Sequence, residues 1–212
     1  INLKHEVQER GFTVAHIKTD SIKIPNATPE IIEFVTEYGK KYGYTFEHEA
    51  TYEKMCLVNK AVYIAKKVPE DGSPAYWEAV GTQFQQPYVF KTLFSKEAIE
   101  PFDDMAETKS VTTALYLDFD EGLGEDKHDL RFIGKVGQFT PVLAGNGGGR
   151  LVREKDGAFH SASGAKDYRW KETFVLREVG DSEVIDRSYY DKQVDEAVSI
   201  ISKFGDFEWF AS

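Results

Sequence analysis

The sequence has little cysteine and no long hydrophobic run, and each scarcity excludes a class of protein. A single cysteine, Cys56, stands among 212 residues, so an internal disulfide framework is excluded. No stretch of about 18 apolar residues is present, which argues against a transmembrane helix. The opening residues, INLKHEVQERGF, lack the pattern of a signal peptide. Together these features predict a protein of a reducing, cytoplasmic compartment.

Positive charge is also scarce, and it is unevenly spread. The formal net charge of −10 argues against a stand-alone, nonspecific nucleic-acid binder. Residues 96–129 carry three basic and eleven acidic side chains, whereas residues 130–172 carry eight and four, a net charge of +4. A local basic surface in this second segment would suit contact with phosphates. What the chain has in quantity is apolar and aromatic residues, 41% and 14%, enough for a sizeable core.

The first 67 residues predict two strands, a helix and two further strands. The residues Lys18-Thr19-Asp20-Ser21 separate two short apolar stretches, as in a tight β-hairpin. Thr28 and Pro29 are the residue types of a helix N-cap and first helical position, and Gly39 or Gly43 would end that helix. The predicted elements are a helix at 2–10 closed by Gly11, strands at 12–17 and 22–24, the helix from 29, and strands at 45–52 and 55–66.

The rest of the chain predicts a β-rich region that ends in a helix. The predicted elements are an aromatic stretch at 76–94, a short acidic helix at 96–109, a strand at 111–119, strand-like segments with glycine turns from 132 to 176, and an amphipathic helix at 188–204 capped by Gly205. The expected fold class is therefore α+β, with an antiparallel sheet and a covering helix, followed by a β-rich region and a C-terminal helix.

Asp20 is the first candidate site residue, because it stands at the tip of the predicted hairpin. A carboxylate held between paired strands suits Mg²⁺, which binds a few protein oxygens together with substrate phosphates. Two-metal phosphoryl transfer needs a second carboxylate nearby, so one aspartate is not a site by itself. The alternative is an ordinary turn, in which Asp and Ser are common residues.

The wider pattern of residues 1–67 resembles the palm of family B DNA polymerases, particularly those of phages. That family has a Tyr-Gly-Asp-Thr-Asp-Ser hairpin, then a helix and a strand pair; here the hairpin is HIKTDS and the later stretch is FEHEATYEKMCLVNKAVYIAKK. The resemblance implies that Asp20 ligates catalytic Mg²⁺ or Mn²⁺. Lys18 stands at the catalytic position of the family's first hairpin aspartate, and Ser21 and Glu49 match positions that support the active site.

The same resemblance implies contacts with a primer strand. Lys60 and Tyr63 match the first Lys and the Tyr of a Lys-Lys-Arg-Tyr-like motif that grips the primer near its 3′ end, whereas Ala61 and Val62 depart from it. On one continuous strand, Lys60 and Tyr63 would point to opposite faces. The alternative is a solvated lysine and a half-buried tyrosine without a role in binding.

A cluster of basic residues later in the chain predicts a second contact with nucleic acid. It is interleaved with Phe159, Tyr168 and Trp170, which would serve as stacking platforms. Its members are Arg150, Arg153, Lys155, Lys166, Arg169 and Lys171. A sheet edge with a solvated charged face is the alternative.

Two loops predict no site. LAGNGGGR, residues 143–150, lacks both glycine patterns of a phosphate cradle and predicts a flexible hairpin loop. The stretch from Asp118 to residue 126 departs from an EF-hand at its fifth and sixth positions, which predicts a solvated acidic loop.

The resemblance implies a C-terminal portion of a larger DNA polymerase, encoded by a phage or a bacterium. Its expected parts are a partial palm at 1–67, a connecting region at 68–129, and a β-rich, thumb-like region at 130–212. Expected partners are primer–template DNA, a deoxynucleoside triphosphate and the missing palm and fingers portion, with no membrane; without that portion the chain would be inactive. The alternatives are a non-catalytic module that binds nucleic acid or protein, and a structural acidic domain.

Overall fold

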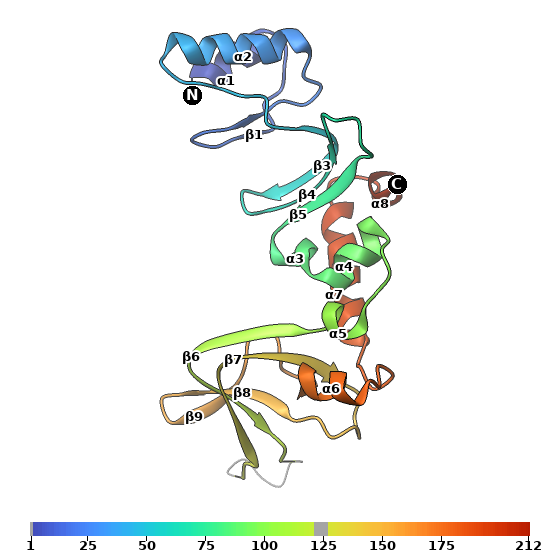
Figure 1. Cartoon of the computed structure of the whole chain (residues 1–212). Helices are drawn as coiled ribbons and strands as arrows, with labels where there is room; N and C mark the ends of the chain where they lie inside the picture. The colour runs from blue at the N-terminus through green and yellow to red at the C-terminus, as the bar shows by residue number, and fades with distance from the viewer. Residues whose placement is uncertain (1, 121–126) are drawn as a thin grey trace. The chain divides into compact units, whose positions relative to one another are not determined.

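The computed structural model describes residues 2–120 and 127–212 (Figure 1). Its helices and antiparallel sheets confirm the predicted α+β class. The chain divides into two compact units: residues up to Thr51 together with Val68–Ser73 form the first, and Tyr52–Lys67 with Pro74–Ser212 form the second. No helix in the described part of the chain is both long and apolar enough to span a membrane.

The first unit begins with a helix, a hairpin and a second helix. Helix α1 (Asn2–Glu9) is followed by Gly11, whose φ of 86° suits a glycine at a helix end. Strands β1 (His16–Ile17) and β2 (Ile22–Lys23) pair antiparallel, as predicted, but have only two residues each. Phe12 and Val14, which were predicted to lie in the first strand, are outside the ladder and pack against the hydrophobic core.

Helix α2 (Pro29–Lys41) begins where the sequence predicts. The Thr28 hydroxyl accepts a hydrogen bond from the backbone N–H of Ile31, and Pro29 occupies the first turn. The helix ends at Lys41, so Gly39 lies inside it and is buried. The core between the two helices contains the buried residues Leu3, Val7, Ile31 and Val35.

The three-stranded sheet contains β3 (Thr51–Asn59), β4 (Val62–Val68) and β5 (Tyr76–Val80), in that order. The predicted strands at 45–52 and 55–66 are wrong in their boundaries, because the chain turns at Lys60 and Ala61. There the side-chain oxygen of Asn59 accepts a hydrogen bond of 2.9 Å from the backbone N–H of Ala61. This local bond to an Asx side chain favours a turn over a continuous strand.

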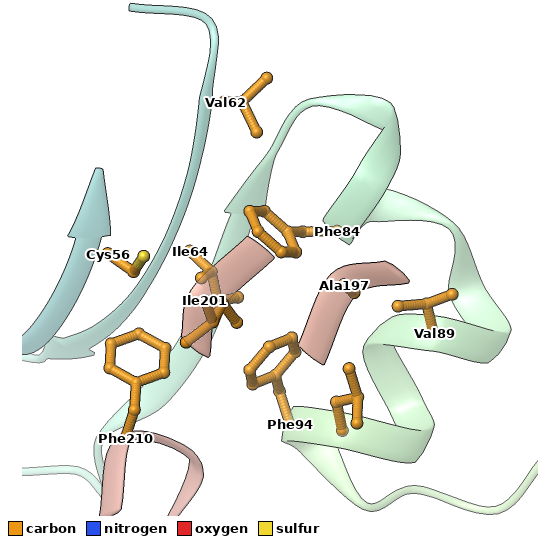
Figure 2. Packing of buried hydrophobic residues seen from close by; sticks show 10 residues of the cluster. Cys56, Val62, Ile64, Phe84, Val89, Phe94, Ala197, Ile201 and Phe210 are labelled. Atoms are coloured by element: carbon orange, nitrogen blue, oxygen red, sulfur yellow. The ribbon is translucent and has the colours of Figure 1, made fainter. Parts of the chain in front are cut away.

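The C-terminal helices α7 (Ser188–Ser202) and α8 (Phe207–Ala211) share a hydrophobic core with this sheet. Figure 2 shows Cys56 and Ile64 near Ile201 and Phe210, and the cysteine is buried in this core. Helix α7 ends at Ser202 with Lys203 as its C-cap, so the predicted cap at Gly205 is wrong. Helix α8 was not predicted; its N-cap residue Asp206 accepts a hydrogen bond of 2.7 Å from the backbone N–H of Trp209.

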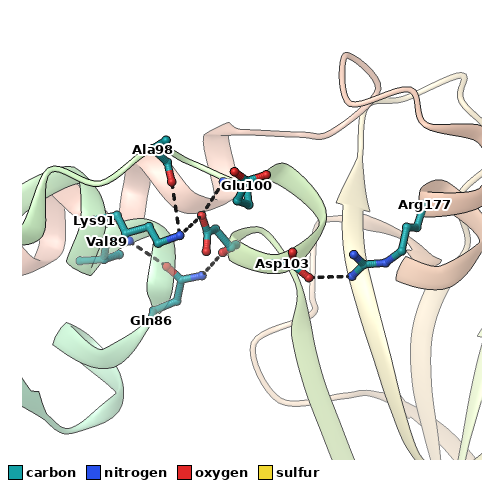
Figure 3. Close-up of polar contacts among 8 residues, drawn as sticks. Gln86, Val89, Lys91, Ala98, Glu100, Asp103 and Arg177 are labelled. Carbon is teal, nitrogen blue, oxygen red and sulfur yellow. Dashed lines mark hydrogen bonds and ion pairs between the residues drawn. The ribbon is translucent and has the colours of Figure 1, made fainter.

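Residues 82–104 form short helices rather than the predicted acidic helix at 96–109. They are α3 (Thr82–Gln85), α4 (Pro87–Phe90), the π-helical turn η1 (Lys91–Ser95) and α5 (Pro101–Asp104). The buried carboxylate of Asp104 organises this stretch, and Figure 3 labels two of its partners, Lys91 and Glu100. It accepts hydrogen bonds from Lys91 Nζ at 2.9 Å and from the backbone N–H of Glu100 at 2.6 Å. These bonds favour a tight turn here over a longer helix.

A five-stranded antiparallel sheet follows. It contains β6 (Glu107–Asp118), β7 (Leu130–Val142), β8 (Arg150–Lys155), β9 (Ala158–Ser161) and β10 (Arg169–Glu172), in the spatial order β10-β7-β6-β8-β9. An additional bridge between Gly149 and Trp170 joins β10 to the residue before β8, so the sheet curls around its core. Leu115, Phe139 and Trp170 are fully buried inside it. The predicted strand-like segment up to 176 is wrong at its end, because helix α6 (Thr173–Val179) begins there.

Candidate functional site

The structure places Asp20 at the tip of the hairpin, as predicted. Strands β1 and β2 pair His16 with Lys23 and Ile17 with Ile22. The backbone N–H of Lys18 donates a hydrogen bond of 2.8 Å to the carbonyl of Ser21, which closes the turn. Lys18 and Asp20 are exposed and Ser21 is half-buried. The carboxylate of Asp20 is therefore presented outward by a closed four-residue turn.

The described residues supply only part of a metal site. No group of three or more His, Cys, Asp or Glu side chains gathers among them in a way that would hold a metal ion. Glu49 is exposed and lies in the irregular segment before β3. Mg²⁺ is commonly held by one or two carboxylates together with substrate phosphates and water. Asp20 fits that pattern as one protein ligand, and the remaining ligands would have to come from elsewhere.

The two predicted primer contacts occupy different kinds of structure. Lys60 lies exposed in the turn between β3 and β4, so its predicted place on a strand is wrong. Tyr63 lies on β4 and is half-buried. Its hydroxyl donates a hydrogen bond of 3.2 Å to Glu78, which also accepts one of 3.3 Å from the hydroxyl of Tyr52. Asp20 belongs to the first unit, whereas Lys60 and Tyr63 belong to the second.

The structure does not bring the later basic residues into one strip. Arg150 and Arg153 lie three residues apart on β8, so their side chains leave opposite faces of the strand. Lys166 is exposed in the connection between β9 and β10, and Arg169 donates a hydrogen bond of 3.0 Å to the carbonyl of Gly148. Trp170 is fully buried, and its indole N–H donates to the carbonyl of residue 165, so it is not available as a stacking platform.

The glycine-rich stretch at 143–149 is not the predicted hairpin loop. It joins β7 to β8, which lie on either side of β6 in the sheet. Gly148 and Gly149 are buried, and Gly149 bridges to Trp170. The stretch therefore helps the sheet to curl. Most of the predicted acidic loop, residues 121–126, lies outside the described residues.

Sequence reasoning missed an ionic cluster around the buried Asp118, at the end of β6. The side chain is fully buried, and one of its oxygens is 2.8 Å from Nδ1 of His128 and 2.6 Å from a guanidinium nitrogen of Arg150. Its other oxygen accepts hydrogen bonds from the backbone N–H groups of Asp120 and Asp129, at 3.1 and 3.0 Å. The available clue was that Asp118 ends an apolar strand and His128 precedes the next one, so pairing of these strands brings them together.

The partners of Asp118 keep it ionised. Burial alone raises the pKa of a carboxyl group, but the hydrogen bonds from His128 and the two backbone N–H groups, with the charge of Arg150, lower the pKa of Asp118 to about 2. An ionised carboxylate only accepts hydrogen bonds, so Nδ1 of His128 carries the proton.

A hollow of about 470 Å³ lies in the first unit. Aromatic side chains dominate its walls, and no predicted site residue is among them. The lining residues are Asn2, Leu3, Tyr38, Gly39, Tyr42, Tyr44 and Phe46.

Comparison with family models, with curated proteins and with solved structures gave no match to the chain. The resemblance to a polymerase palm therefore rests on the residues of this sequence.

Proposed function

We propose that the chain is the C-terminal palm portion, with the region that follows it, of a family B DNA polymerase. The reaction is transfer of a nucleotide to the 3′ end of a primer. One observation carries the proposal: a Thr-Asp-Ser turn, closed by the bond from Lys18 to Ser21, presents the carboxylate of Asp20 at a hairpin tip. The order of elements after it, a capped helix and then a strand pair, also agrees with the palm that the sequence resembles.

In this proposal, the first unit contributes to catalysis by helping to hold a metal ion that stabilises negative charge. Bound Mg²⁺ or Mn²⁺ would neutralise charge on the transferring phosphates. Asp20 would give the metal one carboxylate oxygen, with Ser21 and Glu49 supporting the site. Lys18 would add a positive charge in the same turn, where the family has an acidic residue. A second carboxylate must come from another part of the polymerase, so this chain alone would not extend a primer.

In the same proposal, the second unit holds DNA. Lys60 would contact the primer from the exposed turn between β3 and β4, and Tyr63 would contact it from β4 with its hydroxyl held by Glu78. Arg150, Arg153, Lys166 and Arg169 are proposed to contact DNA phosphates from separate surfaces of the five-stranded sheet.

The proposal is tested by the substitution Asp20→Asn in the natural polypeptide that contains this chain. Primer extension with Mg²⁺ is expected to slow by more than about a hundredfold, because loss of even an outer-shell partner of a metal ligand costs up to about that much. Asp156→Asn is the matched control, since Asp156 is also an exposed aspartate in a hairpin turn, between β8 and β9. Extension at an unchanged rate by the Asp20→Asn protein would rule out the assignment.

A non-catalytic module that binds nucleic acid is the second candidate function. It is favoured by the exposed Phe132 and the half-buried Phe159 on the five-stranded sheet, both from the part of the chain that carries net positive charge. Such a module would hold primer–template DNA equally well with a chelator present. Retention of that binding together with an absence of extension by the natural polypeptide would favour it over a polymerase.

A further inference from the structure

One face of the five-stranded sheet carries a row of aromatic rings. Leu115 and Leu117 point into the core, so Tyr116 between them points to the opposite, outward face. On that face Tyr116 pairs in register with Phe132 of β7, and their ring centroids are 5.5 Å apart. The ring of Phe159 from β9 lies 5.4 Å from Tyr116 on its other side.

His128 extends the row by one ring. Its imidazole lies 5.1 Å from the ring of Phe159, and the bond to Asp118 fixes its orientation. Phe132, Tyr116, Phe159 and His128 therefore form a continuous series, which we call the ring row. These four side chains come from three strands and from the segment before β7.

The ring row is accessible. Phe132, near the start of β7, is 65% exposed, and Tyr116 and Phe159 are half-buried. Tyr116 meets both phenylalanines edge to face, at interplanar angles of 71° and 87°. An edge-to-face pair leaves both faces of one ring uncovered by its partner, so ring faces remain open to a flat ligand. Exposed apolar groups that lie together on a surface commonly mark a binding site.

A cationic group stands at the edge of the ring row. Arg150 occupies the register position opposite Asp118, two residues along β6 from Tyr116, and its side chain is 49% exposed. The ion pair with Asp118 holds its guanidinium in place, while its exposed part can still contact an anion. Phe132, Arg150 and Phe159 come from residues 130–172, which have a net charge of +4, whereas Tyr116 and His128 come from residues 96–129, which have a net charge of −8.

We propose that the ring row binds single-stranded DNA, with bases stacked on the rings and a phosphate near Arg150. Stacking on aromatic side chains beside a positive charge is the common way in which proteins hold unpaired bases. A duplex does not suit this surface, because its base faces are covered by neighbouring base pairs. The inference deepens the proposed function and rests on it for the choice of DNA: the sheet would hold the unpaired strand, apart from the contacts assigned to Lys60 and Tyr63.

The test is the binding of fluorescein-labelled (dT)20 to the purified chain, followed by anisotropy at 50 mM salt with EDTA present. Phe132→Ala is expected to weaken binding by about fivefold or more, the loss that follows removal of one base–aromatic stack. Phe174→Ala is the matched control, because Phe174 is 52% exposed on α6 and lies outside the ring row. Phe132→Trp keeps an aromatic surface and is expected to retain binding, with its fluorescence quenched by stacked bases.

The outcomes separate this inference from the proposed function. Absence of (dT)20 binding, or equal affinities of Phe132→Ala and Phe174→Ala, would overturn the ring row as a site. Tighter binding of (U)20 than of (dT)20 would contradict the choice of DNA. Primer extension that survives Asp20→Asn while Phe132→Ala still weakens (dT)20 binding would reject the proposed catalytic role and leave the inference standing.

Discussion

Asp118 shows how a single carboxylate can organise an end of the five-stranded sheet. It is fully buried, yet it accepts four hydrogen bonds, two of them from the side chains of His128 and Arg150. These partners join the end of β6 to the start of β8 and to the segment that leads into β7. Because the side chains of Arg150 and His128 are partly exposed, loss of the Asp118 charge would cost mainly the hydrogen bonds that it accepts, about 1–3 kcal/mol.

The low pKa of Asp118 predicts how the stability of the folded protein depends on pH. Its pKa is about 2 in the folded protein and 3.8 ordinarily, so the folded state binds this proton more weakly than the unfolded state. The stabilisation is therefore complete above pH 4 and is lost as the pH falls from about 4 to about 2, by about 2 kcal/mol. Urea denaturation at a series of pH values measures this change.

The matched pair for that measurement is Asp118→Asn and Asp156→Asn. At pH 7 the first is expected to lower the free energy of unfolding by about 2 kcal/mol, and the second to leave it within about 0.5 kcal/mol, because Asp156 is exposed. The Asp118→Asn protein should also lose less stability between pH 4 and pH 2. An acid dependence identical to that of the parent would show that another group is responsible.

At the scale of elements, a close contact at Gly39 reverses the usual effect on stability of replacing a helical glycine by alanine. Replacement of glycine by alanine inside an exposed helix usually stabilises it by up to about 1 kcal/mol. In α2, however, a Cβ at position 39 would collide with the ring of Phe46 and would lie 3.1 Å from the carbonyl oxygen of Tyr44. Gly39→Ala is therefore expected to destabilise the protein by about 1–3 kcal/mol.

Thermal denaturation measures that effect, with Lys40→Ala as the control. Lys40 is the neighbouring residue on the same helix, and its ion pair with Glu37 is exposed, so its loss should change little. Gly39→Ala combined with Phe46→Leu should recover part of the stability, because the clashing ring is gone. A higher melting temperature for Gly39→Ala alone would mean that Phe46 does not occupy this position.

The helices were more predictable than the sheets, because their signals are local. Thr28 and Pro29 mark the start of α2 within one turn, and the apolar spacing of α7 identifies that helix without knowledge of its partners. Strand boundaries were less predictable. The turn at Lys60 depends on one side-chain bond from Asn59, and the placing of β6 between β7 and β8 depends on pairing between distant residues.

The candidate sites differ in the same way: the site formed by contiguous residues was predictable, and those formed by distant residues were not. The hairpin of Asp20 was predictable, because a four-residue turn and its two flanking strands are contiguous in the sequence. The cluster around Asp118 and the ring row were not, because each needs the register of β6 against its two neighbours. Arg150 was identified as a basic residue, but its buried partner follows only from that register.

At the scale of the whole molecule, the two units would divide the work of the proposed polymerase. The first unit carries Asp20 and its supporting residues, and its core is a separate cluster around Val7 and Ile31. The second carries Lys60, Tyr63 and the ring row, with the core shown in Figure 2 and that of the five-stranded sheet. In this account, one unit supplies a metal ligand and the other holds DNA.

The most direct test of the account is template-dependent DNA synthesis by the natural polypeptide. It would be captured from its source with an antibody against residues 188–212, and supplied with primer–template, labelled deoxynucleoside triphosphates and Mg²⁺. The account predicts incorporation that follows the template sequence, stops when the metal is chelated, and is absent when the antibody is blocked with its peptide. Capture of the intact polypeptide without any template-dependent incorporation would contradict it.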